Sequence, residues 1–290
     1  MVDPIAAAQA EVTDSRSGNN MNIIQTINME SPELKLYSGL SEPSLYHYFE
    51  PEPGIFIAES PMIIERALNA GYEPLSFLVD EKHLEQDAMP VLKRCEAFES
   101  PIYSMPLDQL KLITGFHLTR GILSAMRRKK MPDPKKLVAN ARRLAVLENI
   151  MNPTNMGAIF RSAAALGIDA ILVTEKSTDP LYRRSSRVSV GTVFQVPWTY
   201  IPDCSCIFDL LTEYGFQTAA MALCENSISL KELNPAKNEK IALFMGTEGT
   251  GLEEETIDAC DLTVKIPMAQ GIDSLNVAAA SAVAFWQIMK

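Results

Sequence analysis

Ile241-Ala-Leu-Phe-Met-Gly-Thr-Glu-Gly-Thr-Gly-Leu252 begins the stretch that decides the fold. Its first five residues are apolar, too few for a helix, and are followed at once by glycine, so they predict a buried strand. A helix-like segment at 253–260 leads to a second apolar strand at 262–266, and an alanine-rich helix follows at 277–290. Each strand therefore ends in a glycine-rich or polar loop that opens into a helix. In open α/β sheets, ligands bind at this edge.

The loops between these elements carry more polar residues than helix capping requires. The glycines after residue 245 do not form the G-x-G-x-x-G pattern, and no Lys-Ser or Lys-Thr pair follows them as a phosphate loop would need. A tight turn with a capped helix is the simpler interpretation. Capping explains one polar residue at a helix start, such as Asp273 or Ser274. It does not explain Glu248 among the glycines together with Asn276, so we predict a ligand site.

The composition bounds the class of protein. The chain has 290 residues, 47% hydrophobic and 21% charged, which suits a soluble protein of two domains. No apolar run approaches the ~20 residues of a membrane helix, and the N-terminus lacks the layout of a signal peptide. The five cysteines are odd in number and scattered, which indicates a reducing, cytoplasmic location. The three histidines lie far apart, so we predict no metal site.

The net charge of −10 is unusual for a nucleic-acid-binding protein. The charge is unevenly distributed, however. From Lys111 to Arg143 there are ten basic residues and a single acid, a net charge of +9, while the other 257 residues contain 16 basic and 35 acidic residues. This basic segment is either a phosphate-binding strip or a solvated linker, and the sequence favours neither.

The chain divides at this basic segment. Residues 1–30 are rich in Asn, Ser, Asp and Ala without a sustained period, which predicts a disordered tail. Residues 31–126 alternate strand and helix patterns and predict a small α/β domain. Residues 127–139 are basic, contain two prolines and predict a semi-rigid linker to a second domain at 140–290.

Helices separate the predicted strands of both domains. Strands are predicted at 54–58, 75–79 and 101–104 in the first domain and at 144–148, 170–173, 194–197, 216–223, 241–245 and 262–266 in the second. Because each strand of the second domain is followed by a helix, we predict an α/β fold with a largely parallel sheet and helices on both of its faces.

Three motifs occur in order along the second domain. They are Asn152-Pro-Thr-Asn-Met-Gly-Ala-Ile-Phe-Arg-Ser-Ala163, Gly246-Thr-Glu-Gly-Thr-Gly-Leu252, and Ile266-Pro-Met268 with Ser274-Leu-Asn-Val277. Together they resemble the SpoU (TrmH-type) branch of the SPOUT RNA methyltransferases. The first domain, through Ile57-Ala-Glu-Ser-Pro61 and Thr114-Gly-Phe-His117, resembles the L30e-like substrate-binding domain that often precedes this catalytic domain.

This resemblance implies a fold and an activity. It implies a parallel sheet with a deep trefoil knot, S-adenosylmethionine bound in the knot, and a homodimer through the C-terminal domain whose subunits complete the active sites. The implied reaction is methylation of a ribose 2′-hydroxyl in rRNA or tRNA, without a membrane or a metal. A catalytically silent RNA-binding or ribosome-assembly factor on the same scaffold is the alternative. A nucleotide-dependent oxidoreductase is disfavoured by the missing G-x-G-x-x-G pattern.

The resemblance also implies roles for individual residues. The cofactor would be bound by Leu223, Gly246, Ile266, Met268 and Leu275. The reaction would be carried by Arg161, Asn155, Glu248, Ser274 and Asn276. The RNA would be bound by Arg127, Arg128, Lys129, Arg183, Arg184 and Arg187. Because a guanidinium stays protonated in proteins, we predict that Arg161 orients the ribose and stabilises developing negative charge, and is not the proton acceptor.

Overall fold

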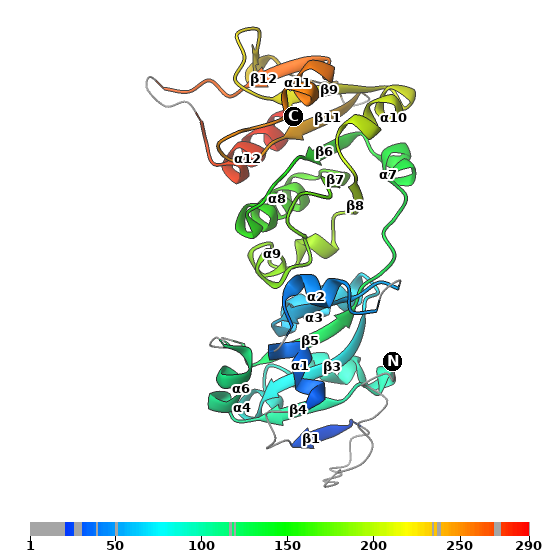
Figure 1. Ribbon diagram of the computed structural model, residues 1–290, viewed down its shortest axis with the longest axis vertical. Coiled ribbons are helices and arrows are strands. Elements are labelled where there is room, and N and C mark those ends of the chain that lie inside the picture. The colour runs from blue at the N-terminus through cyan, green and yellow to red at the C-terminus, as the bar shows by residue number, and fades with distance from the viewer. Residues whose placement is uncertain are drawn as a thin grey trace. The chain divides into compact units, whose positions relative to one another are not determined.

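The computed structural model describes residues 21–25, 31–38, 40–49, 52–115, 118, 120–233, 235–236, 239–269 and 274–289. The chain forms two compact units, residues 1–130 and residues 131–290 (Figure 1). Each unit contains its own sheet and its own hydrophobic core. None of the described helices is long and apolar enough to cross a membrane.

The N-terminal unit is built on a mixed five-stranded sheet in the order β1-β4-β3-β5-β2. Its strands are β1 (Ile23–Gln25), β2 (Ile55–Glu59), β3 (Glu73–Asp80), β4 (Ile102–Met105) and β5 (Ile122–Arg127). Strand β5 runs antiparallel to both of its neighbours, whereas β1, β4 and β3 are parallel. The three strands predicted for this domain are confirmed as β2, β3 and β4.

Short helices cover this sheet. They are α1 (Lys35–Ser38), α2 (Glu42–Tyr46), α3 (Pro61–Asn69), α4 (Glu81–Leu84), α5 (Met89–Arg94) and α6 (Leu107–Thr114), with single 3-10 turns at Pro32–Leu34 and Glu96–Phe98. Alternate side chains of the strands, such as Leu78 and Leu123, form one core cluster with Leu36 of α1 and Leu110 of α6. This alternation follows from the two-residue period of a strand, which sends successive side chains to opposite faces.

The N-terminal unit differs from the prediction at both of its ends. Strand β1 pairs with β4, so the region predicted as a tail contains an ordered strand, while residues 1–20 and 26–30 lie outside the described residues. The predicted linker at 127–139 begins at the last residue of β5 and includes all but the last residue of helix α7 (Pro134–Asn140). Strand β5 was missed because its apolar residues merge into the basic segment without a turn signal. Helix α7 begins at a proline behind the side-chain cap of Asp133, a usual helix start.

The C-terminal unit is built on a seven-stranded sheet in which all the pairings are parallel. The strand order is β10 (Ile228–Ser229), β12 (Leu262–Lys265), β9 (Phe216–Met221), β11 (Lys240–Met245), β6 (Arg143–Leu147), β7 (Ala170–Thr174) and β8 (Trp198–Ile201). The predicted parallel α/β sheet is confirmed. Strand β8 lies four residues later than predicted, because 192–194 form a 3-10 turn and the strand starts only after Pro197. Because the strands are parallel, their carboxyl ends share one edge.

Helices cover both faces of this sheet. Besides α7 they are α8 (Pro153–Leu166), α9 (Arg183–Val188), α10 (Phe208–Glu213), α11 (Glu254–Ala259) and α12 (Val277–Ile288). Helices α7, α10 and α11 pack on a core cluster that includes Val146 and Phe244, while α8 packs against α12 outside that cluster. Figure 1 shows α8 and α12 on one side of the sheet and α7 and α10 on the other.

Arg143, at the start of β6, is buried inside this unit although the sequence placed it in the basic segment. It is 8% exposed. Its Nε donates to the carbonyl of Ile288 at 2.8 Å, Nη1 to that of Glu239 at 2.5 Å, and Nη2 to that of Ala236 at 3.2 Å. The guanidinium thus ties the first strand of the unit to the end of α12, where a positive charge is favourable.

Candidate active site

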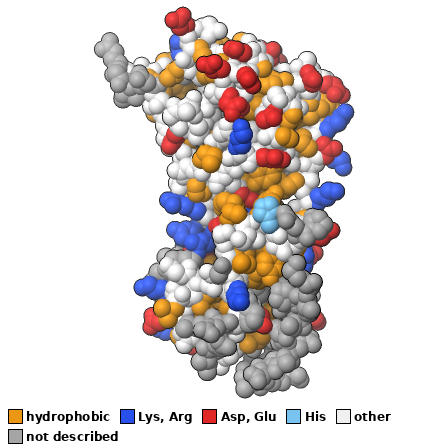
Figure 2. All heavy atoms as spheres, viewed as in Figure 1, with side chains coloured by type: hydrophobic (Ala, Val, Ile, Leu, Met, Phe, Trp, Pro, Cys, Tyr) orange, Lys and Arg blue, Asp and Glu red, His pale blue; other side chains and the backbone are white. Residues whose placement is uncertain are grey.

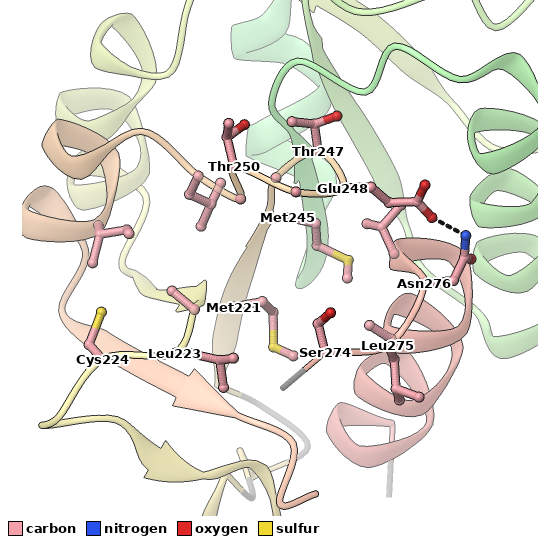
Figure 3. A pocket seen from close by; sticks show the side chains of 18 residues that line it. Met221, Leu223, Cys224, Met245, Thr247, Glu248, Thr250, Ser274, Leu275 and Asn276 are labelled. Carbon is pink, nitrogen blue, oxygen red and sulfur yellow. Dashed lines mark hydrogen bonds between the residues drawn. The ribbon is translucent and has the colours of Figure 1, made fainter. Parts of the chain in front are cut away.

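A pocket of about 600 Å³ lies at the carboxyl ends of β9 and β11. Its walls are the segment after β9, the glycine loop after β11, and the first turn of α12 (Figure 3). The strand-edge argument anticipated this place, because parallel strands direct their following loops to one side of the sheet. Eighteen of the described residues line it. The described lining therefore comes from these three segments and from Ile257 of α11.

The glycine loop is folded back on itself. Thr247 and Gly251 form an isolated antiparallel bridge, and the amide of Gly251 donates to the carbonyl of Thr247 at 3.1 Å. A Cβ on Gly246 would lie 2.2 Å from the carbonyl carbon of Gly251, so only glycine fits there. Gly249 adopts a φ of 92°, which favours glycine at that position as well. The glycines are therefore required by the shape of the loop.

Glu148, which follows β6, supports the exit from this loop. It is 3% exposed; its Oε2 accepts from the amide of Glu253 at 2.8 Å and its Oε1 from the hydroxyl of Thr256 at 2.6 Å. A carboxylate at a helix start satisfies unpaired amides and interacts favourably with the helix dipole. Glu148 thus fixes the start of α11. The sequence analysis missed this role because the partners are more than 100 residues away along the chain.

Asn276 joins the pocket to α8. Its Oδ1 accepts from the amides of Ala278 and Ala279 at the start of α12. Its Nδ2 donates to Oδ1 of Asn155 at 3.1 Å and to Oε1 of Glu248, the contact drawn in Figure 3. The side-chain oxygen accepts and the side-chain nitrogen donates, so the cap and the contacts to Asn155 and Glu248 use different atoms. One asparagine therefore fixes residues from three segments.

Three of the five predicted catalytic residues are brought together by these contacts: Asn155, Glu248 and Asn276. Ser274 lines the same pocket. Arg161 does not belong to this group. It lies on α8, is exposed, and its side chain makes no hydrogen bond or salt bridge within the described part of the chain.

The predicted cofactor residues are divided by the structure. Leu223, Gly246 and Leu275 line the pocket. Ile266 and Met268 follow β12 and are half-buried, but they are absent from the described lining. Sequence reasoning missed Met221, Cys224, Met245, Thr247, Thr250 and Val277, which also line the pocket. Thr247, Thr250 and Val277 lie within the quoted motifs, whereas Met221 and Met245 were marked only by their position at the ends of predicted strands.

The basic residues at the end of β5 are held by aromatic rings of the N-terminal unit. Arg127 lies over Phe49 at 4.8 Å from the ring centroid, Arg128 over Tyr46 at 4.7 Å, and Lys129 over Tyr72 at 4.8 Å. Arg128 is also buried, and its Nε donates to the carbonyl of Ile55 at 3.1 Å. Arg127 and Lys129 are exposed. Arg128 is therefore a structural residue, unlike its two neighbours.

The other predicted RNA-binding arginines lie on α9. Arg184 and Arg187 are exposed, Arg183 is half-buried, and Nε of Arg184 donates to the hydroxyl of Thr154 at 3.0 Å. On the face drawn in Figure 2, acidic side chains are frequent over the C-terminal unit, and Lys and Arg are scattered. Among the described residues, no group of three or more His, Cys, Asp or Glu could hold a metal ion.

The chain is similar to known proteins in sequence and in fold. Residues 142–286 match the SpoU rRNA Methylase family. A 23S rRNA (guanosine-2′-O-)-methyltransferase of Acinetobacter baylyi is 26% identical over 70% of this chain and 84% of its own length. The AdoMet-bound rRNA methyltransferase of Sinorhizobium meliloti superimposes with a TM-score of 0.77 at 21% identity, covering 93% of this chain and 97% of its own. At that identity the structural likeness establishes the fold alone.

A nearer relative settles the family. An uncharacterized tRNA/rRNA methyltransferase of Mycobacterium bovis is 38% identical over 80% of this chain and 80% of its own length. This identity and the family match over half of the residues agree with the motifs and with the pocket between them. The chain belongs to the SpoU rRNA methylase family.

Proposed function

We propose that this chain is an S-adenosylmethionine-dependent RNA methyltransferase that methylates a ribose 2′-hydroxyl of rRNA or tRNA. The observation that carries the proposal is the pocket at the carboxyl edge of the sheet, bordered by the linked side chains of Asn155, Glu248 and Asn276. The Acinetobacter relative is by name a guanosine-2′-O-methyltransferase, and the Sinorhizobium structure contains AdoMet. Both names support the reaction and the cofactor.

The pocket suits a nucleoside-sized ligand. Its volume of about 600 Å³ falls within the ~300–1,000 Å³ of typical small-molecule sites. Met221, Leu223 and Leu275 offer apolar surface to a base, and the backbone at Gly246 carries no side chain that would block main-chain hydrogen bonds. Bound there, S-adenosylmethionine supplies an electrophilic methyl group. The protein contributes by holding the ribose in line with it.

We infer that Arg161 acts at the pocket of a second copy of the chain. It follows Asn155 by six residues on α8, which is about 9 Å along the helix axis and about 120° away in direction. Asn155 points toward Asn276, so Arg161 points away from that contact. In a homodimer, the guanidinium of one copy would orient the ribose at the pocket of the other. It would also stabilise negative charge that develops on the 2′-oxygen.

Helix α12 offers a surface for this dimer. Ala279, Val283, Trp286 and Met289 are exposed and recur every three or four residues, so they share one face of the helix. The Trp286 side chain is 60% exposed. Large apolar side chains gathered on one exposed face are typical of an interaction site. Because α12 packs beside α8, a second copy seated here would also approach Arg161.

Trp286→Arg tests the dimer. We expect the wild-type protein to sediment as a dimer at micromolar concentration and the variant as a monomer without methyl-transfer activity. Leu112→Arg is the matched control, because Leu112 is 71% exposed on α6 and lies in the other unit. It should leave both sedimentation and activity unchanged. A wild-type monomer with full activity would contradict the dimer.

Four exposed basic residues are the proposed phosphate contacts: Arg127, Lys129, Arg184 and Arg187. The buried Arg128 supports its neighbours through Tyr46 and Ile55. The family relation also supports an L30e-like role of the N-terminal unit in RNA binding and a trefoil knot in the C-terminal unit. It also supports a cytoplasmic location.

The deciding experiment maps 2′-O-methyl groups in cellular RNA with and without this chain. We expect one or a few ribose positions in rRNA or tRNA to lose their methyl group in its absence. The purified protein and labelled S-adenosylmethionine should restore them in RNA from those cells, and Asn155→Ala should restore them much more slowly. Methyl groups found on bases would refute the ribose assignment. An unchanged map, with RNA binding retained, would favour the catalytically silent RNA-binding factor.

A further inference from the structure

The described lining of the pocket contains a single charged side chain, Glu248. The other described lining residues are apolar or neutral, including Thr247, Thr250 and Ser274. No lysine, arginine or histidine is among them. Within a single copy of the chain, the described wall therefore carries one negative charge and no positive charge.

Glu248 is held in place without being neutralised. Its Oε1 accepts a hydrogen bond from Nδ2 of Asn276, and Asn276 is itself fixed by capping α12 (Figure 3). No salt bridge to Glu248 exists within the described residues, and its second oxygen accepts no hydrogen bond there. An amide donor orients a carboxylate but leaves its charge intact. The negative charge thus has a defined position at the border of the pocket.

The substrate and product forms of the cofactor differ in charge. When the methyl group moves to the ribose oxygen, sulfur keeps the electron pair of the broken C–S bond and the hydroxyl proton passes to water. The sulfonium becomes a neutral thioether, S-adenosylhomocysteine. Resting on the proposed function, we propose that Glu248 makes the pocket select the cofactor by charge. It binds the sulfonium form more tightly than the thioether product, so methyl transfer itself weakens the hold on the cofactor.

The expected size of this preference follows from Coulomb's law. Two unit charges ~4 Å apart gain about 1 kcal/mol in water and about 4 kcal/mol at the surface of a protein. Glu248 is an exposed residue of the pocket wall, so its interaction lies near the lower figure. Because about 1.4 kcal/mol corresponds to a factor of ten in affinity, a contribution of this size gives roughly a three- to tenfold preference. Such a factor is enough to reduce product inhibition without trapping the substrate.

The test is calorimetric titration of the full-length protein with S-adenosylmethionine and with S-adenosylhomocysteine, in the absence of RNA. Glu248→Gln removes the charge, and its amide oxygen can still accept from Asn276. We expect this variant to bind S-adenosylmethionine about three- to tenfold more weakly and S-adenosylhomocysteine within about twofold of wild type. Thr250→Val is the matched neutral control at the same wall and should change both affinities alike. Glu248→Asp should keep the preference.

Salt provides a second measurement that needs no variant. Raising the ionic strength should reduce the preference of the wild-type protein for the sulfonium, because screening weakens a charge interaction at an open site. An equal loss of both ligands in Glu248→Gln would overturn the inference and make Glu248 a residue that only shapes the pocket. If raising the ionic strength left the ratio of the two affinities of the wild-type protein unchanged, the inference would be overturned too. That result would indicate that a cation such as Arg161 of a second copy neutralises the carboxylate. If the wild-type protein bound neither ligand, the proposed function itself would fail.

Discussion

Replacing Arg143 by methionine tests whether the buried guanidinium holds the C-terminal unit together. The variant keeps most of the side-chain volume but leaves three carbonyls without their donor, those of Ala236, Glu239 and Ile288. Hydrogen bonds from a charged donor contribute about 1.5–3 kcal/mol each, and a buried acceptor left alone costs about 1–3 kcal/mol. The cost of removing the guanidinium from water offsets part of the contribution of these hydrogen bonds.

The surroundings of the three hydrogen bonds determine how much the free energy of unfolding falls. The bond to Ile288 is buried, whereas the other two are partly exposed and can be replaced by water. We therefore expect the free energy of unfolding to fall by about 3–5 kcal/mol, as when other buried charged contacts are broken. For a unit of this size that corresponds to a decrease in Tm of about 10 °C.

Tryptophan fluorescence is a selective probe for this change. The chain contains two tryptophans, Trp198 and Trp286, and both lie in the C-terminal unit. Urea titration followed by their emission therefore reports this unit alone. Arg142→Met is the matched control, because Arg142 is the exposed neighbour and makes its described hydrogen bond through the backbone amide. If Arg143→Met were no more destabilising than Arg142→Met, the tie between β6 and α12 would carry no appreciable energy.

Three further predictions concern the site. Gly246→Ala should abolish calorimetric binding of S-adenosylmethionine while leaving the protein folded, because the new Cβ collides with the backbone of Gly251; normal binding would mean that the loop opens easily. Arg161→Lys should slow single-turnover methylation by at least ~10²-fold with cofactor binding intact, as when one oriented donor is lost, and near-normal turnover would remove it from the reaction. In thiol labelling at pH 8, the exposed Cys206 should react first and Cys224 should be protected by the cofactor, since it lines the pocket. Burial raises the pKa of the remaining three thiols, to about 11 for Cys95, to about 12 for Cys260 and higher still for Cys204. These thiols should therefore stay unreactive in the folded protein. Rapid modification of any of them would contradict this prediction.

Local sequence patterns predicted the elements around the pocket well. The apolar run at 241–245 and the alanine-rich segment from 277 are confirmed as β11 and α12. Both could be predicted because each pattern involves only residues that are neighbours in the sequence. The family assignment is likewise confirmed by the match over residues 142–286. Asn155, Glu248 and Asn276 were named from motifs, and the structure brings them into contact.

The errors arose where the outcome depends on distant partners. A count of charges treated Arg128 and Arg143 as surface cations, but backbone carbonyls from other segments bury both. Glu148 was taken as the last residue of a strand, because nothing nearby indicates that it caps α11. The place of Arg161 relative to the pocket depends on which face of α8 carries its side chain. A sequence motif does not specify how that face is oriented.

The order of the pocket's segments along the chain has a consequence in time. The described lining begins at Met221 and ends at Ala280. The hydrogen bonds of Arg143 are complete only after Ile288 has been synthesised. A ribosome that adds about 5–20 residues per second needs roughly 8–30 s to pass from Lys130 to Ala280. During that interval the N-terminal unit has all of its residues, while the cofactor pocket does not yet exist. S-adenosylmethionine can therefore stabilise the finished C-terminal unit, but it cannot guide the early steps of its folding on the ribosome.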